Sequence, residues 1–217
     1  MTVLDLGPAD VLLRADSGEV LTLDTGRWHD DATDEEQGFL ASVAGPVLDV
    51  GCGPGRLVVA LARRGVPALG IDSSPLAVAT AVDRGAAALQ RDVFGPLPGE
   101  GRWATVLLFD GNVGIGGDPV RLLSRCRQLA WKTGVVLVEV EPPGTGHRRL
   151  RARLERDGER SATFPWSVVG ADAIATLAGA AGLRVESIDV TPSGRRFALT
   201  RGYCTNGGHM PHLRDLE

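Results

Sequence analysis

The chain has 217 residues, of which 43% are hydrophobic and 23% are charged, and this composition predicts one globular domain with an ordinary core. A formal charge of −4 lacks the basic excess of a nucleic-acid-binding protein, and no apolar run approaches the roughly 20 residues of a membrane span. Three widely spaced cysteines and an N-terminus without a signal-peptide pattern argue against a disulfide framework and secretion. We therefore expect a cytoplasmic protein, monomeric or homodimeric, with no nucleic-acid or membrane partner.

Residues 1–45 differ from the rest of the chain and predict an N-terminal cap segment. Within it, the acidic stretch 30–40 predicts a helix that is opened by Thr33 and carries acids in its first turn. Further along, acids alternate with arginines in the locally basic stretch 147–160, and this pattern predicts a solvated helix face.

From residue 46 onward, predicted strands alternate with predicted helices. The strands are expected at 46–50, 67–72, 87–92, 104–110, 134–140, 183–191 and 195–202, and the helices at 56–65, 75–84, about 118–131 and about 170–181. The alternation predicts a doubly wound, Rossmann-like α/β domain over 46–202, with a mostly parallel seven-stranded sheet and an antiparallel hairpin at one edge. Residues 203–217 are expected to be a flexible tail.

A glycine-rich loop follows the first of these strands, in the segment VLDVGCGPGR at 47–56. A dinucleotide-binding loop needs a third glycine or alanine where this chain has Arg56, and a phosphate-binding P-loop needs a lysine followed by serine or threonine. Neither phosphate motif fits. The loop by itself remains compatible with a tight turn that binds nothing.

Acidic side chains at the ends of successive strands indicate which class of ligand the loop binds. Ligands of doubly wound sheets bind beyond the carboxyl ends of the strands. There, Asp72 can accept the hydroxyls of a ribose, Asp92 can accept from an exocyclic amine, and Asp49 can attract a positive group. A positive amine, a ribose and an adenine without phosphates describe S-adenosylmethionine.

The segments VLDVGCGPGR, GIDSS and QRDVF resemble the successive motifs of class I S-adenosylmethionine-dependent methyltransferases, over residues 45 to about 140. The resemblance implies that the methionine part, the ribose and the adenine lie along these motifs, and that the sulfonium lies near Phe109 and Asp110. The implied cofactor-binding residues are Asp49, Gly51, Cys52, Gly53, Gly55, Asp72, Ser73, Asp92, Val93, Phe94 and Phe109, with Trp28 either packing on the cofactor or anchoring the N-terminal helix. Cys52 is expected to fill the loop and not to act as a nucleophile, while Phe94 and Phe109 could instead belong to the core.

The segment LFDGNVGIGGDP at 108–119 resembles the small-molecule members of that family, whereas the nucleic-acid adenine methyltransferases carry an Asn/Asp-Pro-Pro-aromatic segment there. We expect its glycines, Gly111, Gly114, Gly116 and Gly117, to let a substrate approach the methyl group closely. A small-molecule acceptor is therefore predicted. A protein acceptor and a catalytically silent S-adenosylmethionine-binding module remain alternatives.

Methyl transfer from a sulfonium needs alignment first, and a base only where the acceptor is protonated. The candidate catalytic residues are His29, Asp110, Asn112 and Glu141. No metal site is expected, because Cys204, His209 and His212 in the tail lack a usual zinc spacing. The segments 1–45 and 142–170 are left over from the core and are predicted to form a lid over the acceptor.

Overall fold

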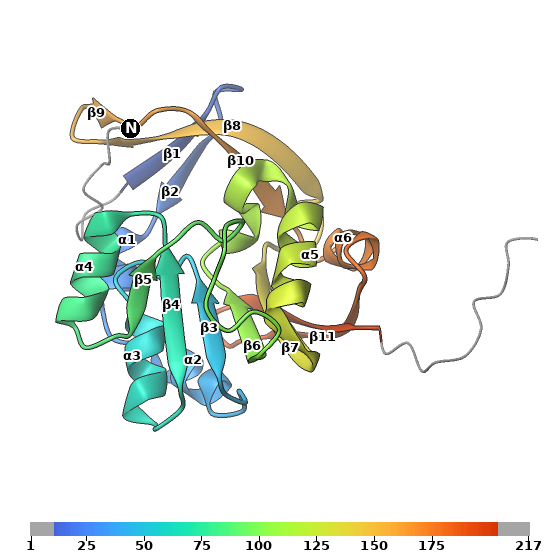
Figure 1. The fold of residues 1–217 in the computed structure, drawn as a ribbon. Helices are drawn as coiled ribbons and strands as arrows, with labels where there is room; N and C mark the ends of the chain where they lie inside the picture. Colours follow the sequence, from blue (N-terminus) through green and yellow to red (C-terminus); the bar gives the residue numbers. More distant parts are fainter. Residues whose placement is uncertain (1–10, 204–217) are drawn as a thin grey trace, which may run out of the picture.

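A computed structural model describes residues 11–203, and its centre is a seven-stranded sheet (Figure 1). The strand order is β11-β12-β7-β6-β3-β4-β5. Neighbours from β7 to β5 pair in parallel, whereas β12 pairs antiparallel with both β7 and β11. The strands are β3 (Val47–Val50), β4 (Ala68–Asp72), β5 (Ala88–Gln90), β6 (Trp103–Leu108), β7 (Ala130–Val140), β11 (Leu183–Val190) and β12 (Arg196–Gly202). The predicted doubly wound sheet with its edge hairpin is confirmed.

Helices cover both faces of this main sheet, as the apolar runs of its central strands require. The helices are α2 (Asp34–Leu40), α3 (Arg56–Arg63), α4 (Pro75–Asp83), α5 (Pro119–Leu129) and α6 (Ile174–Ala180). One buried cluster joins β3, β6 and β7 to α5 and α6, and another joins the opposite face to α2 and α3. Thr33 begins α2 through a capping box with Glu36, so the predicted start of this helix is confirmed.

A second sheet lies beside the carboxyl ends of the main-sheet strands, at the top of Figure 1. Its order is β10-β8-β1-β2, with β9 paired to β8, and these strands all pair antiparallel. The strands are β1 (Val11–Ala15), β2 (Val20–Leu23), β8 (His147–Arg156), β9 (Glu159–Arg160) and β10 (Phe164–Val169). The two segments left over from the core therefore meet in one sheet.

The predicted helix at 147–160 is wrong, because these residues form β8 and β9. β8 is hydrogen-bonded on both sides, to β1 and to β10, so its backbone groups are satisfied by partners that lie far away in the sequence. Leu150, Ala152 and Leu154 alternate with arginines along it, and this period of two puts apolar side chains on one face of the strand. The pairing of β8 with β1 and β10 therefore decides the structure of this segment, although its alternating charges favour a helix.

The 3-10 helix η1 (Asn112–Gly117), which follows β6 of the main sheet, lies against β10 of the second sheet. A Cβ atom on Gly114 would lie 2.2 Å from the carbonyl oxygen of Ser167, and one on Gly117 would lie 2.8 Å from Cβ of Pro165. A Cβ atom on Gly116 would likewise meet the Phe94 ring at 2.9 Å. The expectation that these glycines admit a substrate is therefore corrected, since all three make room for packing. Among the four, only Gly111 has no described atom within 4 Å of such a Cβ.

None of the helices described between residues 11 and 203 is long and apolar enough to cross a membrane. The tail residues Cys204, His209 and His212 lie outside the described residues, as does the N-terminal stretch 1–10. The boundaries of the cap segment, the core and the tail stay predictions.

We predict that Gly114→Ala destabilises the protein by about 2 kcal/mol or more, because the added methyl group collides with backbone that cannot move without separating η1 from β10. Gly179→Ala is the matched control, because nothing lies within 4 Å of the added atom in α6 and alanine favours the helix. Urea unfolding of both variants measures the difference. Equal stability of the two would contradict this account of the η1 contact.

Candidate functional site

The glycine loop between β3 and α3 is attached to the end of β6 through Asn112. The Asn112 amide nitrogen donates to the carbonyl oxygens of Val50 at 3.0 Å and of Gly51 at 2.9 Å. A Cβ atom on Gly51, whose φ is +74°, would lie 2.6 Å from that nitrogen. Gly51 is therefore required by its conformation and by Asn112, and the predicted site residues Gly51 and Asn112 lie in direct contact.

The other side of the loop is open and faces Asp72. Gly53 has a φ of +52°, and a Cβ atom there would have no described neighbour within 4 Å. The Asp72 carboxylate, at the end of β4, accepts from the backbone N–H of Gly53 at 3.0 Å and of Ser74 at 2.8 Å. Burial raises the pKa of Asp72, and these two N–H groups oppose the rise. An acceptor group thus stands beside open space at a strand end, as a ribose-binding residue requires.

Cys52 and Gly55 lie on the packed side of the loop. The Cys52 sulfur contacts the backbone at Gly70, where a Cβ atom would come within 2.6 Å of it, and burial raises the pKa of the thiol. A Cβ atom on Gly55 would lie 2.8 Å from Cβ of Ala81. The side chain of Cys52 therefore fills the loop, and any cofactor contact by these two residues would come from their backbone.

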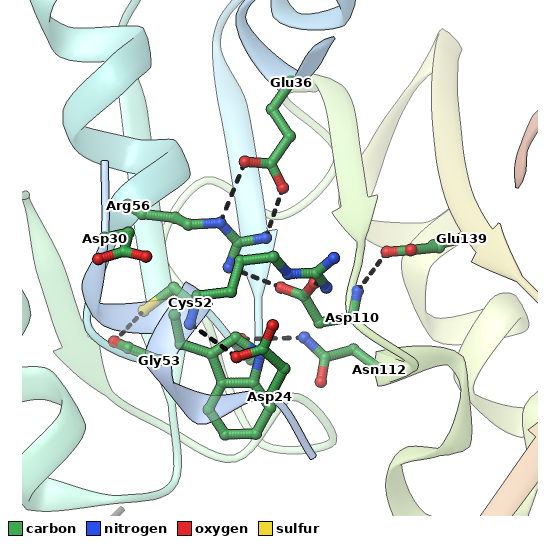
Figure 2. Close-up of polar contacts among 12 residues, drawn as sticks. Asp24, Asp30, Glu36, Cys52, Gly53, Arg56, Asp110, Asn112 and Glu139 are labelled. Atoms are coloured by element: carbon green, nitrogen blue, oxygen red, sulfur yellow. Dashed lines mark hydrogen bonds and ion pairs between the residues drawn. The ribbon is translucent and has the colours of Figure 1, made fainter. Parts of the chain in front are cut away.

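A charge cluster of three arginines and three carboxylates lies next to the loop. Figure 2 labels four of its members, Glu36, Arg56, Asp110 and Glu139. Arg56, in the first turn of α3, binds Glu36 at 2.7 Å through Nη2 and Asp110 at 2.7 Å through Nη1. Arg195 binds Glu36 at 2.6 Å and Glu139 at 2.7 Å. The sixth member is Arg27, from α1 (Thr25–His29), which pairs with Asp110. The cluster joins α1, α2, α3, β6, β7 and the edge hairpin.

The pKa values of two acids in and beside the cluster are shifted in opposite directions, one by ion pairing and the other by burial. Burial by itself would raise the pKa of Glu36, but the hydrogen bond and charge of Arg56 and the hydrogen bond of Arg195 lower it to about 2. Asp49 is 2% exposed, and its burial raises its pKa to about 7 although the charge of Arg56 opposes the rise. Asp49 is thus a buried carboxyl group without a full counter-charge, next to a loop expected to hold a cation.

Asp110 has a left-handed backbone, with a φ of +54°, at the point where β6 ends. Its N–H donates to Glu139 at 2.6 Å, and its carboxylate is shared by Arg27, Arg56 and Arg195. These contacts hold the strained backbone in place. The contacts show that Asp110 holds the end of β6 in place. They do not test a catalytic role, which stays a prediction.

The remaining catalytic candidates lie on different elements. Glu141 is exposed, beyond the end of β7, and its N–H donates to the carbonyl oxygen of Val169. His29 and Trp28 end α1, where the Arg84 guanidinium binds the carbonyl oxygens of Trp28 at 3.4 Å, His29 at 2.8 Å and Asp30 at 2.8 Å. A cation at the end of a helix is favourable, so Arg84 ties α1 to α4.

The residues expected around the adenine are distributed between surface and core. Asp92 is exposed, and its carboxylate accepts from the N–H of Phe94 at 2.9 Å, while Val93 is buried in the core. The Phe94 ring is half-buried beneath the guanidinium of Arg121, 3.9 Å from the ring centroid. Ser73 is exposed next to Asp72.

The Phe109 ring is fully buried between Phe39 and Phe197, with ring centroids 5.9 and 4.6 Å away. Its side chain belongs to the core, so only its backbone can face the predicted sulfonium position.

Sequence reasoning missed most of the charge cluster. The sequence points to Arg56 only as the residue that breaks a dinucleotide motif. Nothing in the local sequence singles out Arg27, Glu36 or Arg195, and Arg195 lies more than 150 residues after the other two. An arginine in the first turn of a predicted helix is the one signal in the sequence, because the helix dipole disfavours a cation there unless carboxylates lie near it.

Comparison with protein families identifies the chain. The model of a methyltransferase domain family matches residues 30–188. The chain belongs to this family. With its glycine loop and its sheet topology it is a class I S-adenosylmethionine-dependent methyltransferase, as the motifs predicted. No curated protein sequence matches the chain.

Solved structures share the fold of this methyltransferase. A methyltransferase from Bacteroides fragilis, solved with S-adenosylhomocysteine, superposes with a TM-score of 0.73 at 20% identity, over 90% of this chain and 88% of that one. A sugar N-methyltransferase from Streptoalloteichus gives 0.60 at 20% identity, over 82% and 90%. The 1,6-didemethyltoxoflavin N1-methyltransferase of Burkholderia thailandensis gives 0.59 at 20% identity, over 83% of each chain.

Asp49→Asn tests the buried carboxyl group. The pKa of Asp49 in the folded protein, about 7, lies above its unfolded value near 4, so the folded state binds the extra proton. Relative to the asparagine variant, the wild type should lose stability as the pH rises from about 4 to about 7, and the difference should level off above that. The free energy of unfolding in urea, measured across this range, checks the prediction. A difference independent of pH would contradict it.

Asp72→Ala should weaken S-adenosylhomocysteine binding by about 1.5–3 kcal/mol, the value of charge-assisted hydrogen bonds to ribose hydroxyls. Calorimetry measures the affinity, with the exposed Asp83→Ala as a control of equal charge change. Circular dichroism verifies the fold. Unchanged affinity in a folded Asp72→Ala variant would place the ribose elsewhere.

Proposed function

We propose that this methyltransferase transfers a methyl group from S-adenosylmethionine to a small-molecule acceptor, bound between the second sheet and the carboxyl ends of the main sheet. The observation that carries the proposal is the contact of β10 with η1. A Cβ atom on Gly114 would lie 2.7 Å from the Trp166 ring. The indole therefore packs against Gly114, which is two residues after Asn112 in the chain. The second sheet thus covers the strand end where the methyl group is expected.

The inner face of the second sheet has the character of a pocket wall. Strand register places Phe164 opposite the fully buried Ala152, and Trp166 opposite Leu150, so these side chains share the inward face. The Phe164 and Trp166 rings meet edge to face with centroids 6.0 Å apart. The half-buried apolar side chains of this face are Leu21, Leu23, Leu150, Leu154, Phe164 and Trp166. Such a surface suits the apolar part of a small ligand.

The residues at the strand ends fit S-adenosylmethionine. Gly53 leaves the space that a Cβ atom would fill, and Asp72 stands beside it as an acceptor for ribose hydroxyls. Asp49 and the backbone of the glycine loop would hold the methionine part, while Asp92, Val93 and Phe94 would hold the adenine. When bound, the cofactor supplies a methyl group on an already activated leaving group.

The chain's own contribution would then be alignment and exclusion of water. Asn112 fixes the glycine loop to the end of β6, and the charge cluster fixes Asp110 beside it. His29 and Glu141 remain the candidates for a base. Two of the structural neighbours are named for small-molecule acceptors, a sugar and a toxoflavin precursor, and this agrees with the proposal.

Methyl transfer from labelled S-adenosylmethionine into a cell extract tests the function. The extract is first separated into a small-molecule fraction and a macromolecular fraction, and each is incubated with the purified full chain. Label in the small-molecule fraction supports the proposal. Label in protein only would favour a protein acceptor, and no label in either fraction would favour a silent binding module.

Phe164→Ala should raise the KM for the acceptor about tenfold and leave the affinity for S-adenosylhomocysteine unchanged, because it removes apolar contact area from the inner face alone. Val20→Ala is the control, since Val20 is 40% exposed and lies opposite Arg14 on the outer face. Steady-state kinetics and calorimetry separate the two effects. A loss of cofactor affinity, with KM unchanged, would contradict the assignment of this wall to the acceptor.

A further inference from the structure

The outer edge of β11 is open to a further strand. Within residues 11–203, β11 is the last strand of the main sheet on this side and pairs only with β12. The second half of the strand, residues 186–190, is fully on the surface, and every residue in it is exposed. A strand edge of this kind presents backbone N–H and C=O groups that another strand can bind, so its side chains decide what that strand can be.

The side chains of β11 are separated by their chemistry between its two faces. Residues that lie opposite each other in a pair of strands share a face, so the partners in β12 show which way each side chain of β11 points. Glu186 is the extra residue of a β-bulge, which shifts the alternation halfway along the strand. The apolar side chains Leu183, Val185, Ile188 and Val190 therefore share one face, and Arg184 and Asp189 share the other.

α6 covers only the first half of the apolar face. Leu183 is 1% exposed and belongs to the same buried cluster as Ala178 of α6, and Val185 packs against this cluster. Ile188 and Val190, further along the strand, are outside the cluster and are 37% and 61% exposed. The apolar face of β11 thus extends beyond the helix that covers it.

A second copy of β11 matches this half-covered face. A twofold axis perpendicular to the sheet, placed at the bulge, pairs the strand antiparallel with itself. Leu183 then lies opposite the partner's Val190, and Val185 lies opposite the partner's Ile188. Both pairs are apolar, and each joins a covered side chain to an exposed one. α6 of each chain therefore lies beside the exposed end of the other chain's strand.

The same axis brings opposite charges together on the other face. Arg184 lies opposite the partner's Asp189, and symmetry makes this pair twice. Both side chains are exposed. Glu186, close to the axis, is already paired with Arg184 at 3.1 Å and with Arg201 at 3.2 Å, so its two copies do not meet as uncompensated acids. Opposite charges directly across a pair of strands stabilise it, and like charges destabilise it.

We propose that this chain forms a symmetric homodimer in which β11 of each copy pairs antiparallel with β11 of the other, in the register that places Arg184 opposite Asp189. The two seven-stranded sheets join into one continuous sheet across the twofold axis. The contact uses the same surface on both chains, so it closes at two copies and leaves neither β11 edge open to a third.

Sedimentation velocity of the full chain, over a range of concentrations, tests the proposal. Wild type should dimerise. Arg184→Asp and Asp189→Arg should each raise the dissociation constant of the dimer about tenfold or more, because each substitution places like charges opposite each other at two symmetric points. Arg64→Asp and Asp83→Arg, at exposed positions at the ends of α3 and α4, carry the same changes in charge and should dimerise as wild type does.

Mixing the two interface variants separates pairing between chains from an effect on the fold of each chain. Arg184→Asp presents two acids on this face and Asp189→Arg presents two arginines, so an equimolar mixture should form a heterodimer about as stable as the wild-type homodimer. Positions 184 and 189 are roughly 15 Å apart along one strand, so neither can restore the other within a chain. A chain with both substitutions should dimerise again.

The apolar half of the contact has its own test. Ile188→Ser should also weaken the dimer, whereas Val82→Ser, at a 52% exposed position of α4, should not. Circular dichroism verifies the fold of every variant. A wild type that stays monomeric at all concentrations would overturn the proposal. A dimer that Arg184→Asp, Asp189→Arg and Ile188→Ser all retain would also overturn it, and so would folded charge variants that remain monomeric after mixing.

Discussion

Arg56 is buried at the first turn of a helix, where the helix dipole already disfavours a cation, and only Glu36 and Asp110 make this arrangement stable. Much of the site depends on that pairing. Removing one partner of a buried ion pair costs about 3–5 kcal/mol, because the remaining charge stays in a medium of low polarity. The helix that follows the glycine loop is thereby tied to α2 and to the end of β6.

The same cluster explains how a strained backbone persists at Asp110. A left-handed conformation costs a non-glycine residue of the order of 1–3 kcal/mol, and here three guanidinium groups and Glu139 hold it. The strain turns the chain sharply after β6 and directs Asn112 back onto the glycine loop. One electrostatic cluster thus aligns two loops that come from different strands.

The second sheet adds enclosure to this alignment. It is assembled from segments that precede and follow most of the main sheet, because β1 pairs with β8 across more than 130 residues of sequence. Its inner face is apolar, whereas Arg14, Arg151 and Arg153 alternate to the outer face and pair there with acids. A cover made in this way can vary in its side chains while the cofactor-binding sheet stays the same, which suits a fold whose members differ in their acceptors.

The sequence by itself determined the main sheet, the glycine loop and the family, because these depend on patterns within single strands and turns. Apolar runs predicted β3, β6 and β7, and Asp72 was expected at the end of a strand beside the loop. The tertiary structure decided the rest. Residues 147–156 form a strand because β1 and β10 supply its hydrogen bonds, and Gly114 serves packing because β10 lies on it. Arg27, Glu36 and Arg195 meet only in the folded chain, since charge pairing over such separations leaves no local pattern to read.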